Sequence, residues 1–241
     1  MLSEPETSSF GPFFDLTAIF PRGVFAYFLL KGNSGGAPET VAAFLASRGH
    51  EGIKVHRVDQ VHSATVVPAD KTPCEADAII VTSPGEAARI VTADCVPILL
   101  ASSDGRAAAV HAGWRGTLAG ITYSALNALG ANPATVSAYL GPAIGPCCYT
   151  VDASRHGLLR EAFPEIVPMH VSKEPRRLDL SAINAALLSK AGVPRERIFR
   201  EARCTSCDDA LCCSYRRDGE RAGRMVAVIG LERWREVPCP R

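Results

Sequence analysis

The chain has 241 residues, and its 26 basic side chains nearly balance its 25 acidic ones, for a formal net charge of +1. Hydrophobic residues make up 47% of the sequence and charged residues 21%, which is ordinary for a globular protein. This balance, without any polybasic run, argues against a dedicated nucleic-acid binder.

The N-terminal part of the sequence shows no sign of membrane insertion or export. Its longest apolar stretch, residues 24–30, falls well short of the ~18 residues that span a bilayer. Glu4 and Glu6 stand where a signal peptide would carry basic residues. The sequence therefore predicts a soluble, cytoplasmic protein without a membrane partner, and it leaves the oligomeric state open.

The first half of the chain shows one helix followed by strands. A proline in the first turn and apolar residues at helical spacing predict a helix over 38–47. Short apolar runs then predict strands over 53–58, 78–82, 89–92, 98–101 and 107–111. Ser103-Asp104-Gly105, between the last two runs, is typical of a hairpin turn.

The second half mixes helices and strands without a regular order. Apolar spacing predicts helices over 117–129, over 152–163 with Asp152 as N-cap, and from Asp179 or Ser181 to the glycine at 192. Strands are predicted over 136–140, 198–202 and 225–231. This irregular order favours a mixed α/β (α+β) fold, with a sheet and flanking helices in a single domain of residues 1–241.

The sequence contains nine cysteines, many for a protein of a reducing compartment. Six of them stand in three close pairs: Cys147-Cys148, Cys204-x-x-Cys207 and Cys212-Cys213. In such a compartment thiols are buried, metal-bound or catalytic. Cys204-x-x-Cys207 lacks a second pair at the spacing of a zinc ribbon, so structural thiols, a metal site and a redox pair all stay open. We expect Cys147 and Cys148 to pack near a functional site.

His62, Cys95 and His111 form the most informative group of residues. Cys95 follows a predicted strand and His111 ends another, and strand ends beside loops are where functional sites are usually built. Two imidazoles and a thiolate suit Zn²⁺ with an open fourth position, which is the arrangement of catalytic zinc. Such an ion lowers the pKa of its bound water towards ~7. The spacings match no local zinc motif, so three separate core residues are the alternative.

Five segments of the sequence match the motifs of a known family. They are residues 60–63 (QVHS), 92–95 (TADC), 111–116 (HAGWRG), 140–149 (LGPAIGPCCY) and 214–219 (SYRRDG). Over about residues 53–231 the chain resembles the family variously called multicopper polyphenol oxidase (laccase), purine nucleoside phosphorylase or peptidoglycan editing factor. The resemblance implies an α/β fold like that of the catalytic domain of bacterial deamidating toxins.

The resemblance also implies a zinc-dependent purine nucleoside enzyme. It implies zinc at the positions matched by His62, Cys95 and His111. The activities attributed to the family are phosphorolysis of adenosine, inosine, guanosine and methylthioadenosine, and hydrolytic deamination of adenosine. A purine nucleoside and phosphate are therefore the expected small-molecule partners.

Three residues near these ligands are further candidates. Asp94, next to a ligand, is a candidate catalytic carboxylate that either carries a proton or orients the ligand. Gln60 and Arg115 are candidate substrate contacts. Upstream, residues 30–36 run almost directly into a helix, where the family has a longer segment, and Lys31 is the candidate phosphate contact there.

Two other classes of function stay open. One family name suggests a copper oxidase that acts on phenols, but multicopper oxidases need His ligands for three types of copper, and this sequence has six His residues. A single copper ion could bind the same His and Cys side chains. The second alternative is a peptidoglycan-precursor editing or partner-binding protein, in which zinc is mainly structural.

Overall fold

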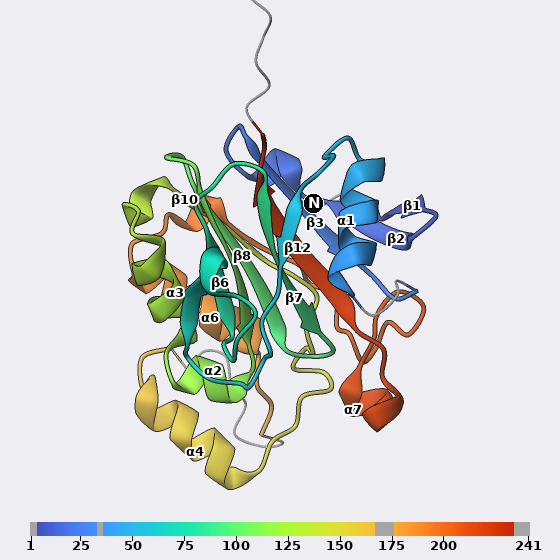
Figure 1. Ribbon diagram of the computed structural model, residues 1–241. Coiled ribbons are helices and arrows are strands. Elements are labelled where there is room, and N and C mark those ends of the chain that lie inside the picture. The colour runs from blue at the N-terminus through green and yellow to red at the C-terminus, as the bar shows by residue number, and fades with distance from the viewer. Residues whose placement is uncertain (1–3, 33–35, 167–175, 234–241) are drawn as a thin grey trace, which may run out of the picture.

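The computed structural model describes residues 4–32, 36–166 and 176–233, and its strands form two six-stranded sheets (Figure 1). The first sheet has the order β1 (Glu6–Ser8), β2 (Gly11–Asp15), β3 (Val24–Leu29), β12 (Met225–Leu231), β7 (Glu86–Thr92), β4 (Lys54–His56). The second has the order β11 (Ile198–Arg200), β10 (Val136–Leu140), β8 (Val96–Ser102), β9 (Arg106–Ala112), β6 (Ala78–Val81), β5 (Val66–Pro68). Both sheets are mixed, since β4, β5 and β11 each run parallel to their neighbour.

Helices cover the outer faces of both sheets, which gives four layers (Figure 1). The α-helices are α1 (Pro38–Ser47), α2 (Trp114–Leu118), α3 (Ile121–Leu129), α4 (Ala153–Ala162), α6 (Leu180–Lys190) and α7 (Tyr215–Asp218). The 3₁₀ helices are η1 (Thr17–Ile19), η2 (Ala69–Lys71), η3 (Pro133–Thr135), η4 (Arg195–Arg197) and η5 (Gly219–Arg221). Helix α1 packs on the first sheet, and α3 and α6 pack on the second. Within the described ranges, no helix has the length and apolar character needed to cross a membrane.

The central strands are apolar on both faces because each is buried on both sides. Along β12, Met225, Ala227 and Ile229 belong to the core between the two sheets. Val226 and Val228 instead pack in the core under α1. All seven residues of β12 are buried, so the strand has a continuous apolar sequence in place of an alternating one.

Most of the predicted elements are present, and the mixed α/β class is confirmed. Helix α1 and strands β10 and β12 have the predicted bounds. Asp152 and Asp179 cap α4 and α6, since each side chain accepts a hydrogen bond from a backbone N–H in the first turn. The predicted turn joins β8 to β9, with Gly105 at a φ of +80°.

The structure corrects three expectations. The helix expected over 117–129 is two helices, α2 and α3, because Gly120 adopts a left-handed φ of +87° between them. The strands divide into two sheets instead of one. Residues 24–29, noted above only as an apolar stretch, form β3 in the middle of the first sheet. A short apolar run by itself does not distinguish a buried strand from other buried segments.

Gly230 lies where β12 is most tightly enclosed by its neighbours. An added Cβ would lie 2.7 Å from both the Ala87 Cβ and the Glu86 carbonyl oxygen, and it would contact the Phe25 ring. We expect Gly230→Ala to lower the free energy of unfolding by about 1–3 kcal/mol, as measured by chemical denaturation. The control is Gly157→Ala in α4, where an added Cβ meets nothing within 4 Å. Gly157→Ala should raise the free energy of unfolding by about 0.5–1 kcal/mol. If the two variants changed the free energy of unfolding by the same amount and in the same direction, the packing argument would be contradicted.

Candidate metal centre

The structure brings His62, Cys95 and His111 together. The pairing of β8 with β9 places Val96 opposite Ala112, so Cys95, just before β8, lies beside the end of β9 that carries His111. His62 comes from the loop between β4 and β5. The ligand atoms of the three residues all lie within 4.8 Å of one another, and the Cys95 Sγ is 3.9 Å from the His62 Nε2.

Asp77, immediately before β6, orients two of these three residues. Its Oδ1 accepts a hydrogen bond from the His62 backbone N–H at 3.0 Å and lies 2.8 Å from the His111 Nδ1. Its Oδ2 accepts hydrogen bonds from the Ser63 backbone N–H and hydroxyl, at 2.6 and 2.8 Å. Because an ionised carboxylate only accepts hydrogen bonds, the Nδ1 of His111 carries a proton and its Nε2 is left for a metal ion.

Sequence patterns do not single out Asp77. The only local signal is an acidic residue directly before the apolar strand β6, at a position that is fully buried in the fold. A buried carboxylate is costly unless hydrogen bonds satisfy it, so its presence there indicates a specific set of donors. Those donors belong to residues 14 to 34 positions away in the chain, and only the fold brings them near.

The charges of the site favour an ionised thiol. Burial opposes ionisation of Asp77, but hydrogen bonds from His111 and Ser63 more than compensate and lower its pKa to about 2. Burial also opposes the charged form of His111, yet Asp77 and Cys95 raise its pKa to about 9. For Cys95, burial is outweighed by hydrogen bonds with His111 and His62, which lower its pKa to about 7. The site thus offers a thiolate to a cation, and binding displaces the proton from the His111 Nε2.

Two residues of the site, His62 and Asp94, have a strained backbone conformation. In the part of the chain that the structure describes, the only non-glycine residues with a positive φ are His62, at 62°, and Asp94, at 91°. Such conformations cost roughly 1–3 kcal/mol and cluster at functional sites. A Cβ at Gly113 would lie 2.9 Å from the His62 ring and 3.0 Å from the Cys95 Sγ, so the turn after β9 needs glycine.

These residues fit a metal ion. Two imidazoles and one thiolate are borderline-soft donors, which suit a divalent ion such as zinc. Three protein ligands leave one position of a tetrahedron for water or substrate. All three ligands line the same cavity, so an ion that they hold would be next to it.

The cavity beside the three ligands has a volume of about 720 Å³. This is within the ~300–1,000 Å³ that is typical of small-molecule sites. Six arginines line it: Arg57, Arg89, Arg115, Arg155, Arg216 and Arg224. The acidic residues in the lining are Asp59 and Asp94. The excess of guanidinium groups favours an anionic ligand.

Arg89, on β7, is the buried member of this set. Its side chain is 8% exposed, and its Nε has no hydrogen-bond partner among the described residues. Burial, and then repulsion from Arg57, lowers its pKa. A buried donor without a partner costs free energy, so this position is unfavourable for an arginine unless it has a role. In the sequence Arg89 is a single basic residue inside an apolar strand, and no local pattern marks it as functional.

Gln60 and Arg115, the predicted substrate contacts, both line the cavity. The Gln60 amide is paired with the backbone of Val91, donating to its carbonyl oxygen and accepting from its N–H, each at 2.8 Å. Arg115 is exposed, and its guanidinium carbon lies 4.8 Å from the centre of the Trp114 ring. A second guanidinium, that of Arg155, lies 4.5 Å from the same ring, so Trp114 packs between cations and core.

Asp94, the predicted catalytic carboxylate, also lines the cavity. Its Oδ1 accepts a hydrogen bond from the Thr205 hydroxyl at 2.5 Å, and its Oδ2 accepts one from the Arg216 backbone N–H at 2.6 Å. Both oxygens therefore bind the C-terminal segment of the chain. These bonds hold that segment against the loop that carries Cys95.

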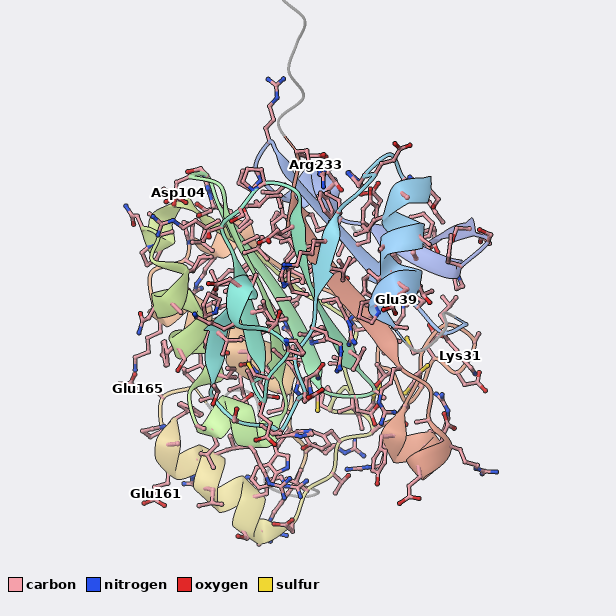
Figure 2. All side chains as sticks on the ribbon, in the orientation of Figure 1. Lys31, Glu39, Asp104, Glu161, Glu165 and Arg233 are labelled. Atoms are coloured by element: carbon pink, nitrogen blue, oxygen red, sulfur yellow. The ribbon has the colours of Figure 1, made fainter. Side chains whose placement is uncertain are left out.

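Lys31, considered above for phosphate, is not among the residues that line the cavity. It is exposed at the edge of the molecule (Figure 2). Its Nζ donates a hydrogen bond to the Asp209 carbonyl oxygen at 2.6 Å. Residues 33–35 of the same segment lie outside the described residues. The cations that face the cavity are arginines from other parts of the chain.

Comparison with known proteins shows the family of the chain. Residues 21–232 match the family model described as multi-copper polyphenol oxidoreductase laccase. The chain belongs to this family. A solved structure of the same fold, that of protein NMB0706 from Neisseria meningitidis, is similar to this family member with a TM-score of 0.81 at 26% identity. The similarity covers 91% of this chain and 99% of that one.

Two similar proteins carry the name purine nucleoside phosphorylase. The protein YlmD of Geobacillus stearothermophilus is 39% identical over 180 residues, which are 71% of this chain and 64% of that relative. A protein of Deinococcus radiodurans is 38% identical over 201 residues, which are 81% of this chain and 77% of that relative. This member of the laccase family thus spans just under two thirds of the first relative's length.

Asp77→Asn tests whether the buried carboxylate orients the ligands. An amide cannot accept hydrogen bonds at both of its atoms, so the loop of His62 or the ring of His111 loses its partner. We expect the affinity for a bound metal ion to fall by about 10–100-fold, as measured by competition with a chromogenic chelator. Asp70→Asn, at an exposed carboxylate on η2, is the control and should leave the affinity unchanged. Equal affinities in the two variants would contradict the orienting role.

Proposed function

We propose that the protein is a zinc-dependent purine nucleoside phosphorylase, with hydrolytic deamination of adenosine as a second reaction. The observation that supports this best is the cavity that joins His62, Cys95 and His111 to Arg89, whose buried Nε has no hydrogen-bond partner among the described residues. The names of similar proteins support it as well. In phosphorolysis, a phosphate oxygen bonds to the ribose C1′ while the C1′–N9 bond breaks. The base leaves with the electron pair and takes up a proton.

Arg89 is the proposed phosphate contact. Its guanidinium belongs to the cavity lining and can donate to a phosphate oxygen there, and a charge-assisted hydrogen bond is strongest where water is excluded. Arg57 lines the same cavity and is close enough to lower the pKa of Arg89. Asp59, which is 2.7 Å from the Arg57 guanidinium, offsets part of their repulsion, and an anion between the two guanidinium groups would offset the rest.

Tyr215 is the proposed contact for the purine. It begins α7, lines the cavity and leaves 54% of its surface exposed. An exposed aromatic face at a cavity suits stacking on a flat base. Arg115 lies in the same lining as an exposed cation and is the proposed second substrate contact.

The remaining roles follow from the contacts of each residue. When bound at His62, Cys95 and His111, Zn²⁺ would lower the pKa of a water molecule towards ~7 and supply hydroxide for attack on C6 of adenosine, whose exocyclic C6–N bond then breaks to release ammonia. Asp94 is proposed to orient the site, because both of its oxygens already accept hydrogen bonds. Gln60 is proposed to fix the position of β7 beside the cavity, because its amide binds the backbone of Val91 on that strand. The second N–H of the amide is proposed to contact substrate.

The two alternative functions have less support from the site. The groups of described residues that could hold a metal ion contain only two histidines, both in the site above. Three types of copper require more imidazole ligands than that, so the family name by itself does not favour a copper oxidase here. A peptidoglycan-editing role stays a prediction, with no contact in the cavity that points to it.

Product analysis with adenosine tests the proposed function. We expect zinc-loaded protein to release adenine only when phosphate is present, and inosine with or without phosphate. Cys95→Ala removes one metal ligand, so both products should vanish, which also controls for a contaminating host enzyme. Circular dichroism of the variant shows whether it is folded. Identical product traces from the two proteins would contradict the proposal.

Arg89→Met separates phosphate binding from the rest of the reaction. Methionine keeps the aliphatic volume but removes the charged donors, so we expect the KM for phosphate to rise about 10–100-fold. The rate of deamination should change little, because that reaction uses no phosphate. Steady-state kinetics of phosphorolysis and of deamination test both expectations. Lys71→Met, an exposed lysine on η2, is the control. An equal loss of both activities in Arg89→Met would contradict a specific phosphate role.

A further inference from the structure

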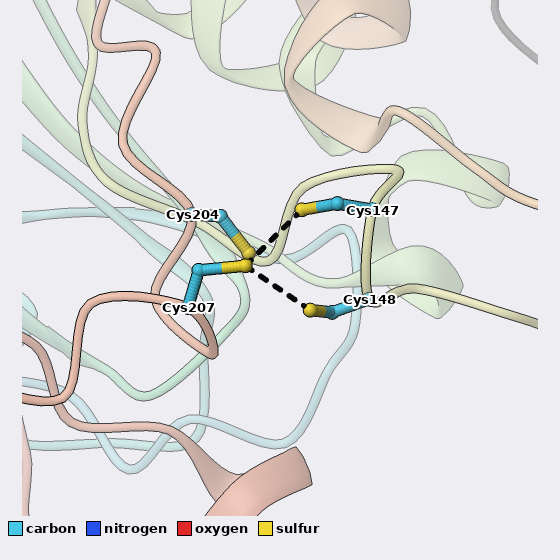
Figure 3. Close-up of side chains that lie close together, drawn as sticks. All are labelled: Cys147, Cys148, Cys204 and Cys207. Carbon is cyan, nitrogen blue, oxygen red and sulfur yellow. Dashed lines mark hydrogen bonds between the residues drawn. The ribbon is translucent and has the colours of Figure 1, made fainter.

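Four cysteines form a cluster that is separate from the site of His62. The sulfur atoms of Cys147, Cys148, Cys204 and Cys207 all lie within 4.8 Å of one another. The Cys207 Sγ is 3.5 Å from that of Cys147 and 3.4 Å from that of Cys148 (Figure 3). The first two residues lie in the loop after β10, and the other two lie in the segment after β11. This four-cysteine cluster thus joins two loops that are far apart in the sequence.

The spacing of the sulfur atoms fits one tetrahedral ion. Zinc–sulfur bonds of about 2.3 Å place the corners of a tetrahedron about 3.8 Å apart. Two of the sulfur–sulfur distances, 3.4 and 3.5 Å, are slightly shorter than this value. All of them are at most 4.8 Å, so the four sulfur atoms are spaced about as zinc requires. A disulfide needs sulfur atoms at about 2.05 Å, and the cysteines of the described residues are all free thiols. An iron–sulfur cluster binds its thiolates through several iron ions and would hold them farther apart.

The backbone prearranges the cluster. The Gly145 N–H donates a hydrogen bond to the Cys204 Sγ at 3.2 Å, which favours the thiolate form of a ligand. The backbone N–H groups of Cys207 and Asp208 both donate to the Cys204 carbonyl oxygen, which closes the Cys-x-x-Cys turn common in zinc sites. A Cβ on Gly145 would lie 3.2 Å from the Cys204 Cβ and 3.3 Å from the Cys147 Sγ, so this glycine lets the two loops approach.

We propose that the four-cysteine cluster binds one Zn²⁺ ion and is a second, structural metal site. Four thiolates complete the coordination of zinc and leave no position for water or substrate. They also leave a net negative charge on the site, and two cations lie beside it. Arg216 donates to the Cys148 carbonyl oxygen at 2.8 Å, and Arg217 donates to the Thr205 carbonyl oxygen at 2.9 Å. These guanidinium groups offset part of that charge.

The proposed ion fixes one wall of the cavity. The loop of Cys148 continues into Tyr149, which lines the cavity. The segment of Cys204 continues into Thr205, whose hydroxyl donates to Asp94. Zinc between the two loops therefore sets the position of the wall without touching substrate. The proposal does not rest on the nucleoside function, since it concerns different ligands.

Metal analysis of the full-length protein, purified under reducing conditions from zinc-supplemented cells, tests this proposal. We expect two zinc ions per chain in the wild type, one each in Cys207→Ser and Cys95→Ala, and none in the double variant. Cys74→Ser, at a half-buried thiol outside both sites, is the control and should keep two. The proposal would be overturned if the wild type held one zinc ion per chain and Cys207→Ser held the same one. Iron at this site in place of zinc would also overturn it.

Cobalt binding gives a second readout that does not depend on Cys207→Ser. Added to Cys95→Ala from which zinc has been removed by a chelator, Co²⁺ should produce the intense visible absorption of a tetrahedral tetrathiolate ion. Adding Cys148→Ser to that variant should remove the absorption and lower the melting temperature by roughly 5 °C or more relative to the zinc-loaded parent. Circular dichroism shows whether the variant is folded. Peptide mapping shows whether a disulfide joins the two loops. If it does, and if no cobalt absorption appears after the disulfide is reduced, the proposal would be overturned in favour of a redox pair.

Discussion

The carboxylate of Asp77 is the contact on which the metal centre depends. It is fully buried, and its two oxygens bind the loop of His62 on one side and the ring of His111 on the other. The His111 backbone N–H also donates to the Asp77 carbonyl oxygen at 2.7 Å, so the register of β6 against β9 sets their positions. Each donor that lost this partner would cost roughly 1–3 kcal/mol. The strained backbone of His62 is maintained by the same hydrogen bonds.

Two stacked sheets explain why residues far apart in the chain meet at one cavity. The second sheet supplies Cys95 and His111 at one end of the β8–β9 hairpin. The first sheet supplies Arg89 on β7, with the amide of Gln60 bonded to the same strand. Arg89 and His111 thus stand on well-packed strands, whose register limits their movement. Such rigid support allows Arg89 to stay buried although its Nε has no hydrogen-bond partner among the described residues.

The loops after β10 and β11 complete the cavity with little regular structure of their own. Asp94 binds the second of these loops through Thr205, and the four-cysteine cluster brings both loops together. A small ion can supply the rigidity that a hydrophobic core gives elsewhere. Cys212 and Cys213 are different, because both are buried in the core between the sheets. Burial raises the pKa of Cys212 to about 12, so that thiol is chemically inert.

The sequence by itself determined the mixed α/β class, most strands and helices, and the motifs that carry His62, Cys95 and His111, because local periodicity, caps and motif residues encode these features. The tertiary structure decided the rest. The division into two sheets, the role of Asp77, the unpartnered Arg89 and the gathering of four cysteines all depend on strand register and loop packing between distant segments. Local spacing does not encode those contacts, because a side chain acquires its partners only when sheets and loops pack together.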